Sequence, residues 1–322
     1  MISKDGVAVM QKPAPEKKLK LQKLALGTVQ LGLDYGRVNK SGQPSRFDAV
    51  NIIKKAVSSG VEVIDTARAY GDSEAVIGEA LGGNFGNVFV TTKLSPLDNL
   101  PENVSAKDVE REVLSSVNLS LDNLKTKRID VLMLHRWQHR TAFNGAIWRT
   151  LLSLQKEGVI DKIGVSVSSP DEACEALSDV NVKYVQLPFN LLDSRWNFDR
   201  VRTAVDVRPD VEIQARSVLL QGILASPSDC WPKISDVDSE AIVKKLDEMV
   251  QEFGRTSRAD LCYAYVRAMP WISSVVVGME TLAQLDENIE LFSLAALTAS
   301  QCEIVRENFC DIPEELLNPA KW

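Results

Sequence analysis

Polar residues stand at the ends of several short apolar runs in this sequence, and Tyr70 follows one of them. The runs end in, or are directly followed by, Asp65, Lys93, His135, Ser166, Gln186, Arg216 and Ser217. If the runs are parallel strands of a barrel, their carboxyl ends meet at one mouth, where barrel enzymes build their active sites. An acid, a cation, an imidazole and hydrogen-bonding groups would converge there, with Tyr70 in reach on the loop after Asp65. Such side chains transfer protons and stabilise charge.

Eight short β-rich runs predict the strands that would carry these residues. They begin at Leu24, Val61, Asn87, Ile129, Lys162, Lys183, Val211 and Ser273. The runs are almost uniformly apolar and do not alternate, which is typical of strands buried on both faces. Longer segments with helical periodicity lie between them, over residues 46–59, 73–81, 105–121, 147–156, 170–177, 194–205, 239–253, 257–268 and 282–291.

Eight strand–helix units in 322 residues predict an α/β fold, a (β/α)8 TIM barrel of eight parallel strands with an outer ring of helices. A doubly wound sheet is disfavoured because no GxGxxG follows Leu26. We expect a lead-in segment over residues 1–20 and one barrel domain over residues 21–322. Residues 226–238 are predicted to form a long loop after the seventh strand, and an extra helix is predicted after Thr298.

Composition excludes several classes of protein. Apolar residues are 45% and charged residues 25%, so the chain is globular, and 37 basic against 44 acidic residues give a net charge of −7. An acidic chain without a basic run is a poor binder of nucleic acid or anionic membranes. The first residues lack the apolar core of a signal peptide, and no apolar run approaches the ~18 residues of a membrane span. We therefore expect a cytoplasmic protein.

Cysteine and histidine usage argues against disulfides and metals. The five cysteines are scattered and never form CxxC, so they are predicted to be reduced thiols. The two histidines, His135 and His139, do not stand at metal-ligand spacing from a cysteine or a motif-forming carboxylate. No protein metal site is expected.

The stretch GVEVIDTARAYGDSEAVIGEAL, from Gly60 to Leu81, places an Asp at the end of the second strand, then a Tyr, then a Glu before a helix. Further motifs follow in order at strand ends, namely LGTVQLG, VTTK, LMLH, KIGVS, QLPFN, RSVLLQGIL and VVVGMETLAQLDEN. Together they resemble the aldo-keto reductases over residues 24–291. The resemblance implies an oxidoreductase that reduces an aldehyde or ketone to an alcohol with a nicotinamide cofactor. A sugar-like carbonyl compound is one candidate for the substrate.

The resemblance also implies a catalytic tetrad of Asp65, Tyr70, Lys93 and His135. Hydride transfer to a carbonyl builds negative charge on its oxygen, which a positioned proton donor must neutralise. Tyr70 would be that general acid, and Lys93 beside it would favour the phenolate form. Asp65 would keep Lys93 charged and oriented. His135 would bind the carbonyl oxygen and orient the substrate.

Cofactor residues are implied on the later strands. Ser166, Gln186 and Asn190 match positions around the nicotinamide, and Ser217, Leu219 and Gln221 match the loop that holds the pyrophosphate. Gly278, Gln284, Glu287 and Asn288 match the adenosine end, at a helix start where backbone N–H groups favour phosphate.

Three positions depart from the family's pattern. Val167 stands where an Asn usually follows the serine of the fifth strand. Arg216 replaces an aromatic residue that stacks on the nicotinamide, although a guanidinium can stack as well. Glu280 replaces a basic residue that recognises the 2′-phosphate of NADPH, and a carboxylate there would accept ribose hydroxyls instead. NADPH is the family's usual cofactor, and Glu280 makes NADH its competitor.

Tyr35 and Trp137 are candidate contacts for a small carbonyl substrate. Three other functions stay open on the sequence: an NAD-dependent aldose dehydrogenase working in the oxidative direction, a cofactor-binding regulatory subunit, and a barrel aldolase with Lys93 as Schiff-base nucleophile. The oligomeric state is also left open.

Overall fold

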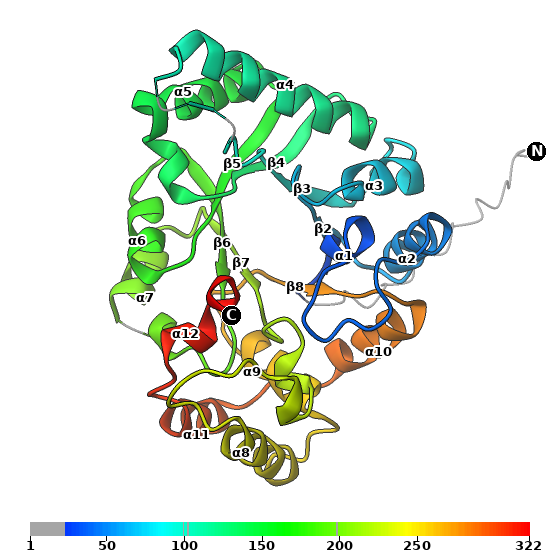
Figure 1. Ribbon diagram of the computed structural model, residues 1–322, viewed down its shortest axis with the longest axis vertical. Helices are drawn as coiled ribbons and strands as arrows, with labels where there is room; N and C mark the ends of the chain where they lie inside the picture. Colours follow the sequence, from blue (N-terminus) through cyan, green and yellow to red (C-terminus); the bar gives the residue numbers. More distant parts are fainter. Residues whose placement is uncertain (1–22, 99, 102, 198) are drawn as a thin grey trace, which may run out of the picture.

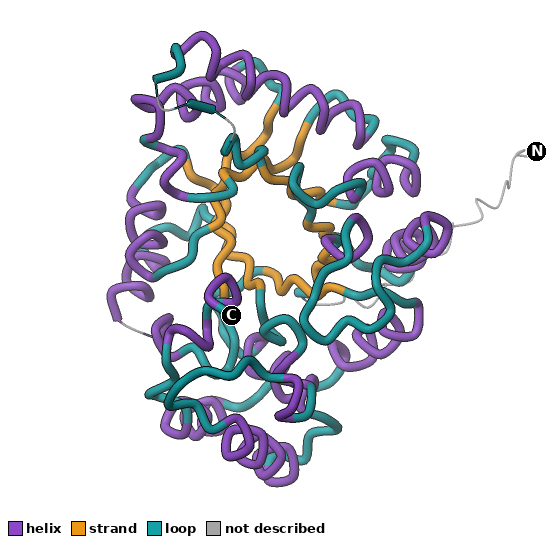
Figure 2. Tube along the Cα trace, in the orientation of Figure 1, coloured by secondary structure: helices purple, strands orange, loops and turns teal. Residues whose placement is uncertain are grey.

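The eight predicted strands form a closed parallel barrel with helices around it (Figures 1 and 2). This computed structural model describes residues 23–98, 100–101, 103–197 and 199–322, so the expected lead-in over residues 1–20 lies outside the described residues. Each strand pairs in parallel with the next, and β8 returns to pair with β1. The prediction of a (β/α)8 barrel is confirmed.

The strands are short and almost completely buried, as their apolar runs predict. They are β1 (Leu24–Gly27), β2 (Val63–Asp65), β3 (Phe89–Lys93), β4 (Ile129–Leu134), β5 (Ile160–Ser166), β6 (Val182–Pro188), β7 (Glu212–Arg216) and β8 (Ser274–Gly278). Asp65, Lys93, Ser166 and Arg216 are the last residues of their strands, and His135 follows β4. The strand ends therefore bring the candidate site residues to one end of the barrel.

Helices lie outside the barrel and cover the outward faces of the strands (Figure 2). They are α1 (Val29–Gly32), α2 (Arg46–Ser58), α3 (Ser73–Leu81), α4 (Ala106–Leu124), α5 (Ala142–Lys156), α6 (Pro170–Ser178), α7 (Asp199–Asp206), α8 (Ser239–Glu252), α9 (Arg258–Arg267), α10 (Leu282–Ser293), α11 (Ala299–Asn308) and α12 (Glu314–Leu317). Five short 3₁₀ helices are η1 (Trp137–Arg140), η2 (Ser194–Asn197), η3 (Ile223–Ala225), η4 (Ser228–Cys230) and η5 (Pro319–Lys321).

Serine caps fix several helix starts where the sequence predicts them. Ser45, Ser105 and Ser257 each accept a hydrogen bond from the backbone N–H three residues later. No helix in the described ranges has the length and apolarity needed to cross a bilayer.

Two predicted helices differ from the observed ones. The helix expected over 147–156 begins earlier, at Ala142, but Phe143, Asn144 and Gly145 have left-handed dihedral angles that kink its first turn. The segment expected as one helix over 194–205 contains η2 and then the separate α7. Periodicity does not reveal such interruptions, because they leave the apolar spacing of the flanking turns intact.

The barrel interior changes from apolar to polar toward the strand ends. Val131, Met133 and Tyr184 form a small buried cluster inside the barrel, with Phe89 packed against it. Above them lie Lys93 and Gln186, each about 1% exposed. The interior is therefore a packed plug of side chains with its charged layer at the mouth.

Candidate active site

Asp65 and Lys93 form a buried ion pair at the ends of the neighbouring strands β2 and β3. Lys93 Nζ lies 2.9 Å from both carboxylate oxygens of Asp65 and donates a third hydrogen bond to the Thr66 carbonyl oxygen at 3.1 Å. Thr91 Oγ1 donates to Asp65 Oδ1 at 2.9 Å. Burial lowers the pKa of Lys93, but the Asp65 carboxylate and the Tyr70 phenol together raise it above its ordinary value. Lys93 is therefore held as an ammonium ion.

A chain of hydrogen bonds crosses the barrel from Asp65. Gln186 Nε2 on β6 donates to Asp65 Oδ1 and to Gln214 Oε1, both at 2.7 Å. Gln214 Nε2 donates to Ser274 Oγ at 3.1 Å, and Ser274 Oγ lies 3.5 Å from the Tyr184 hydroxyl. Because β2 and β6 are not neighbours in the barrel, the Asp65–Gln186 bond braces the interior from side to side.

Tyr70 and His135 complete the group at the mouth. Lys93 Nζ lies 4.9 Å from the centroid of the Tyr70 ring, and the His135 ring meets Tyr70 edge-on at a centroid distance of 6.2 Å. Burial lowers the pKa of His135 to about 3, assisted by the positive charges of Lys93 and Arg216. The imidazole is therefore neutral near pH 7. In this state one ring nitrogen can donate a hydrogen bond and the other can accept one.

Two glycines allow the loop after β2 to present Tyr70. Gly71 has φ of +53°, in the left-handed region, and a Cβ atom there would overlap the carbonyl oxygen of Gly32. A Cβ atom at Gly32 would in turn overlap the carbonyl oxygen of Tyr70. The Tyr70 carbonyl also accepts a hydrogen bond of 3.0 Å from the N–H of Ser73, where α3 begins. Close packing of α1 against this loop thus fixes the backbone at Tyr70.

Glu74 anchors the same loop through Arg68 and Thr92. Its side chain is fully buried, forms an ion pair with Arg68 and accepts a 2.7 Å hydrogen bond from Thr92 Oγ1. The backbone N–H of Arg68 donates to the Lys93 carbonyl oxygen at 3.0 Å. Sequence reasoning did not assign roles to Glu74, Thr91 or Gln214. The sequence signal for Thr91 and Gln214 is a polar residue within a strand run, whereas Glu74 stands in the first turn of α3.

The residues expected near a nicotinamide lie at the ends of β5 and β6. Ser166 is buried, and Asn190 Nδ2 donates to the Ser217 carbonyl oxygen at 3.4 Å. Gln186 Oε1 is buried and has no hydrogen-bond partner in the described part of the chain. An unpaired buried acceptor costs stability. A ligand amide N–H would satisfy it, so this end of the site fits a carboxamide.

The loop after β7 holds an unusual backbone. Ser217, Leu220 and Gln221 have φ of 59°, 48° and 55°, a left-handed conformation that side chains rarely adopt. Such concentrated strain is typical of ligand-binding segments. Gln221 Nε2 donates to the Tyr35 hydroxyl at 3.4 Å, which joins this loop to the loop after β1. Leu219, also expected at a pyrophosphate, is half-buried on the same loop.

Two of the residues expected to bind adenosine, Gln284 and Asn288, form hydrogen bonds within the protein. Thr281 and Gln284 form a capping box at the start of α10, with Gln284 Oε1 accepting from the backbone N–H of Glu280 at 2.6 Å and of Thr281 at 3.1 Å. Asn288 is buried and accepts from the Tyr263 hydroxyl at 3.0 Å. Gly278 ends β8 and leaves no room for a Cβ atom beside the Gln30 amide, whereas Glu287 is exposed.

The two candidate substrate contacts have different surroundings. Tyr35 is 41% exposed beside the mouth. Trp137 is buried in η1, its indole N–H donates to Glu175 Oε2 at 2.7 Å, and the Arg140 guanidinium lies 5.3 Å from its ring centroid. The contacts of Trp137 are those of a packed structural residue. A substrate role stays a prediction for both side chains.

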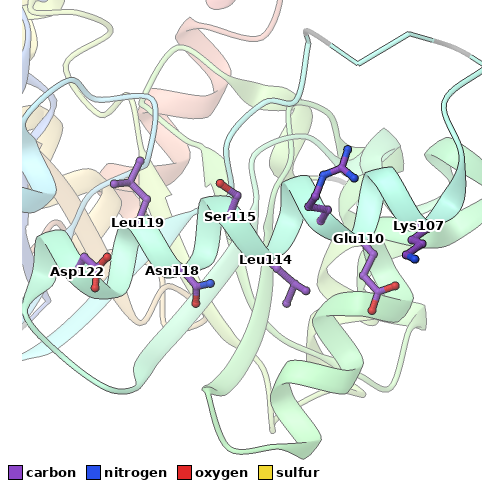
Figure 3. A pocket seen from close by; sticks show the side chains of 8 residues that line it. Lys107, Glu110, Leu114, Ser115, Asn118, Leu119 and Asp122 are labelled. Carbon is purple, nitrogen blue, oxygen red and sulfur yellow. The ribbon is translucent and has the colours of Figure 1, made fainter.

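A shallow hollow lies elsewhere, along the outer face of α4 (Figure 3). It has a volume of about 770 Å³ and is lined by Lys107, Glu110, Arg111, Leu114, Ser115, Asn118, Leu119 and Asp122. These side chains come from one helix on the outside of the barrel, away from the strand ends. Within the described ranges, no group of three or more His, Cys, Asp or Glu residues could hold a metal ion.

Comparisons with known proteins give the family. The family model described as "Aldo/keto reductase family" matches residues 23–308. The uncharacterized oxidoreductase YqkF of Bacillus subtilis (strain 168) is 23% identical over 306 residues, which are 90% of this chain and 93% of that protein. Norsolorinic acid reductase of Aspergillus flavus is 26% identical over 86% of this chain and 75% of that protein.

Solved structures share the fold. An aldo-keto reductase from Bacillus halodurans, solved in its holo form, superposes with a TM-score of 0.70 at 20% identity, covering 92% of this chain and 95% of that chain. A putative aldo-keto reductase from Pseudomonas aeruginosa gives a TM-score of 0.58 at 21% identity, over 88% of this chain and 94% of that chain. The resemblance inferred from the sequence motifs is confirmed, and the chain belongs to the aldo/keto reductase family of oxidoreductases.

Proposed function

We propose that this protein reduces an aldehyde or ketone to an alcohol with NAD(P)H, using Tyr70 as the general acid. The observation that carries the proposal is the meeting of Tyr70, Lys93, Asp65 and His135 at one barrel mouth. Lys93 Nζ lies 2.9 Å from Asp65 and 4.9 Å from the Tyr70 ring centroid. The ammonium ion, fixed by Asp65, stabilises negative charge on the Tyr70 oxygen as the phenol gives up its proton.

His135 acts as the neutral member of the group. Its pKa is lowered to about 3 by burial and by the nearby cations. The ring is therefore uncharged near pH 7, and Lys93 remains the positively charged member of the group. A neutral imidazole donates one hydrogen bond, and a carbonyl oxygen accepts it. That hydrogen bond orients the carbonyl toward Tyr70 and stabilises the charge that develops on the oxygen.

The state of Lys93 disfavours the aldolase alternative. A Schiff-base lysine must be neutral to attack a carbonyl, and such lysines have lowered pKa values. The pKa of Lys93 is raised instead, because Asp65 and Tyr70 outweigh its burial. Lys93 therefore serves as a fixed positive charge.

The nicotinamide cofactor supplies the hydride when bound. Ser166, Gln186 and Asn190 would hold its carboxamide, and the strained loop with Ser217, Leu219 and Gln221 would hold its pyrophosphate. The unpaired Gln186 Oε1 supports the first of these assignments. The residues from Gly278 to Asn288 would hold the adenosine. Glu280 there repels a 2′-phosphate, which favours NADH over NADPH relative to a basic residue at this position.

Tyr70→Phe tests the proposal. We expect turnover of a carbonyl panel to fall by ~100-fold or more, because the proton donor is lost. Cofactor affinity, measured by fluorescence titration with NADPH and NADH, should stay near that of the wild type. Tyr35→Phe is the matched control, since it removes a phenol at the same mouth and should alter KM more than turnover. Unchanged turnover in Tyr70→Phe would show that another group gives the proton.

A further inference from the structure

Gln186 uses both of its side-chain N–H donors inside the barrel. Its Nε2 donates one hydrogen bond to Asp65 Oδ1 and another to Gln214 Oε1, both at 2.7 Å. A side-chain amide nitrogen carries two hydrogens, so neither of them is left for a ligand. The Gln186 Oε1 atom is buried and has no hydrogen-bond partner among the residues that the structure describes. Gln186 therefore offers a bound molecule an acceptor and no donor.

Gln214 is itself held in one orientation. It is buried on β7, directly opposite Gln186 in the register of β6 and β7. Its Nε2 donates to Ser274 Oγ at 3.1 Å, and its Oε1 is the atom that faces Gln186. The backbone of Gln186 is fixed as well, because its carbonyl oxygen accepts a hydrogen bond of 2.8 Å from the N–H of Val167. Asp65 and Gln214 together hold the side chain.

The other residues near the proposed carboxamide site do not replace this acceptor. Both ends of the Asn190 side chain are engaged by backbone groups, a carbonyl oxygen at 3.4 Å from Nδ2 and an N–H at 3.0 Å from Oδ1. Val167 has an apolar side chain and can neither donate nor accept. Ser166 contributes a hydroxyl group, which can donate to a carbonyl oxygen. The N–H side of a carboxamide therefore depends on Gln186 Oε1.

We propose that Gln214 is a positioning residue for the cofactor, because it accepts the second N–H of Gln186 and so keeps Oε1 as the face that Gln186 offers. The site then selects a pyridine ring whose substituent carries an N–H. This inference rests on the proposed nicotinamide-dependent function. The bond to Asp65 fixes the nitrogen of Gln186 but not the plane of its amide. Without Gln214 Oε1, the second N–H loses its acceptor and can turn to a carbonyl oxygen of the ligand.

The test compares two dinucleotides that differ in one group. NAD⁺ carries a carboxamide on its pyridine ring, whereas acetylpyridine adenine dinucleotide carries a methyl ketone, which keeps the carbonyl oxygen but has no N–H. Calorimetric titration gives both dissociation constants. The wild type should bind NAD⁺ more tightly by ~10-fold or more, because the ketone leaves Gln186 Oε1 unpaired. In Gln214→Leu this ratio should fall by ~3-fold or more, because the released N–H can bind the ketone oxygen.

Three further variants separate positioning from a general loss of stability. Gln214→Glu should keep the wild-type ratio, because a carboxyl group in either protonation state can accept the N–H of Gln186. Gln214→Met is closer to glutamine in length and should lower the ratio even if Gln214→Leu does not fold. Tyr184→Phe is the matched control. It removes a buried hydroxyl that lies 3.5 Å from Ser274 Oγ, and it should keep the ratio whatever its melting temperature in thermal denaturation.

These titrations need no turnover, so they separate the inference from the proposed function. A ratio that falls in Gln214→Leu and persists in Gln214→Glu would support the role of Gln214 even if no carbonyl compound were reduced, in which case the proposed reduction alone would fail. An unchanged ratio in Gln214→Leu and Gln214→Met, or a wild-type ratio near one, would overturn the inference and leave an observed carbonyl reduction standing. A protein that binds neither dinucleotide would contradict both.

Discussion

Replacement of Asp65 should destabilise the fold strongly, because this carboxylate neutralises a buried ammonium ion. Four hydrogen bonds end on its oxygens, two from Lys93 and one each from Thr91 and Gln186. In Asp65→Ala, the Lys93 ammonium would lose both carboxylate acceptors and keep uncharged ones such as the Thr66 carbonyl oxygen. Breaking a buried pair by removing one partner costs about 3–5 kcal/mol. We expect the free energy of unfolding to fall by that amount at pH 7.

The assay is urea denaturation followed by circular dichroism, with the free energy of unfolding obtained by linear extrapolation. Asp286→Ala is the control, since it removes the partner of Lys55 from an ion pair of 2.6 Å whose side chains are 40% and 57% exposed. That exposed pair should contribute less than about 1 kcal/mol. The double variant Asp65→Ala/Lys93→Met removes the stranded charge and should be more stable than Asp65→Ala alone.

The pH dependence gives a second readout of the same pair. In the wild type the pKa of Lys93 is raised, so its contribution is complete below the unfolded value of 10.5 and is lost as the pH rises through the folded value. In Asp65→Ala, burial is opposed only by the Tyr70 phenol, and as the largest effect on Lys93 it lowers that pKa, so the variant should regain stability as the pH rises toward 10.5. A loss no larger than that of Asp286→Ala, or a double variant less stable than Asp65→Ala, would refute the assignment of a stranded charge.

Three further variants test the site and its supports. Glu280→Arg should shift cofactor preference toward NADPH, measured as the ratio of dissociation constants for the two cofactors; an unchanged ratio would mean that residue 280 does not meet the 2′ position. His135→Gln should flatten the acid dependence of stability. Unfolded histidine takes up a proton near pH 6.5 while His135 resists protonation down to about 3, so the wild type should lose about 1–2 kcal/mol more than the variant between pH 7 and 5. Equal losses would contradict the buried neutral imidazole. Gly71→Ala should destabilise the fold more than Gly82→Ala in thermal denaturation. Both glycines have positive φ, but only a Cβ atom at Gly71 would overlap backbone atoms. Equal destabilisation by the two variants would show that this overlap does not contribute.

The strands and most helix starts could be predicted from the sequence because their signals are local. Uniform apolar runs locate all eight strands, and Ser45 and Ser257 are recognisable caps. The strand-end positions of Asp65 and Lys93 follow from the same runs. Because parallel strands align their carboxyl ends, the convergence of the candidate site follows from the fold class.

The features that the sequence did not predict depend on contacts between distant segments. The bond from Gln186 to Asp65 requires knowledge of which strands face each other across the barrel. The role of Gly32 depends on the approach of α1 to the loop carrying Tyr70. On the sequence alone, Gln284 could be a cofactor contact or a helix cap. The structure shows that it accepts hydrogen bonds from the N–H groups of Glu280 and Thr281. The roles assigned to the cofactor and substrate residues remain predictions.

The cross-barrel bond also sets what Gln186 can offer a visiting molecule. A carboxylate cannot donate, so Asp65 forces the –NH₂ side of the glutamine amide inward, where it also meets Gln214 Oε1. The carbonyl side is left as the free face. The Asp65 carboxylate thus sets the orientation of an amide on the opposite side of the barrel, and an apolar residue at position 65 would leave only Gln214 Oε1 to hold the amide this way round.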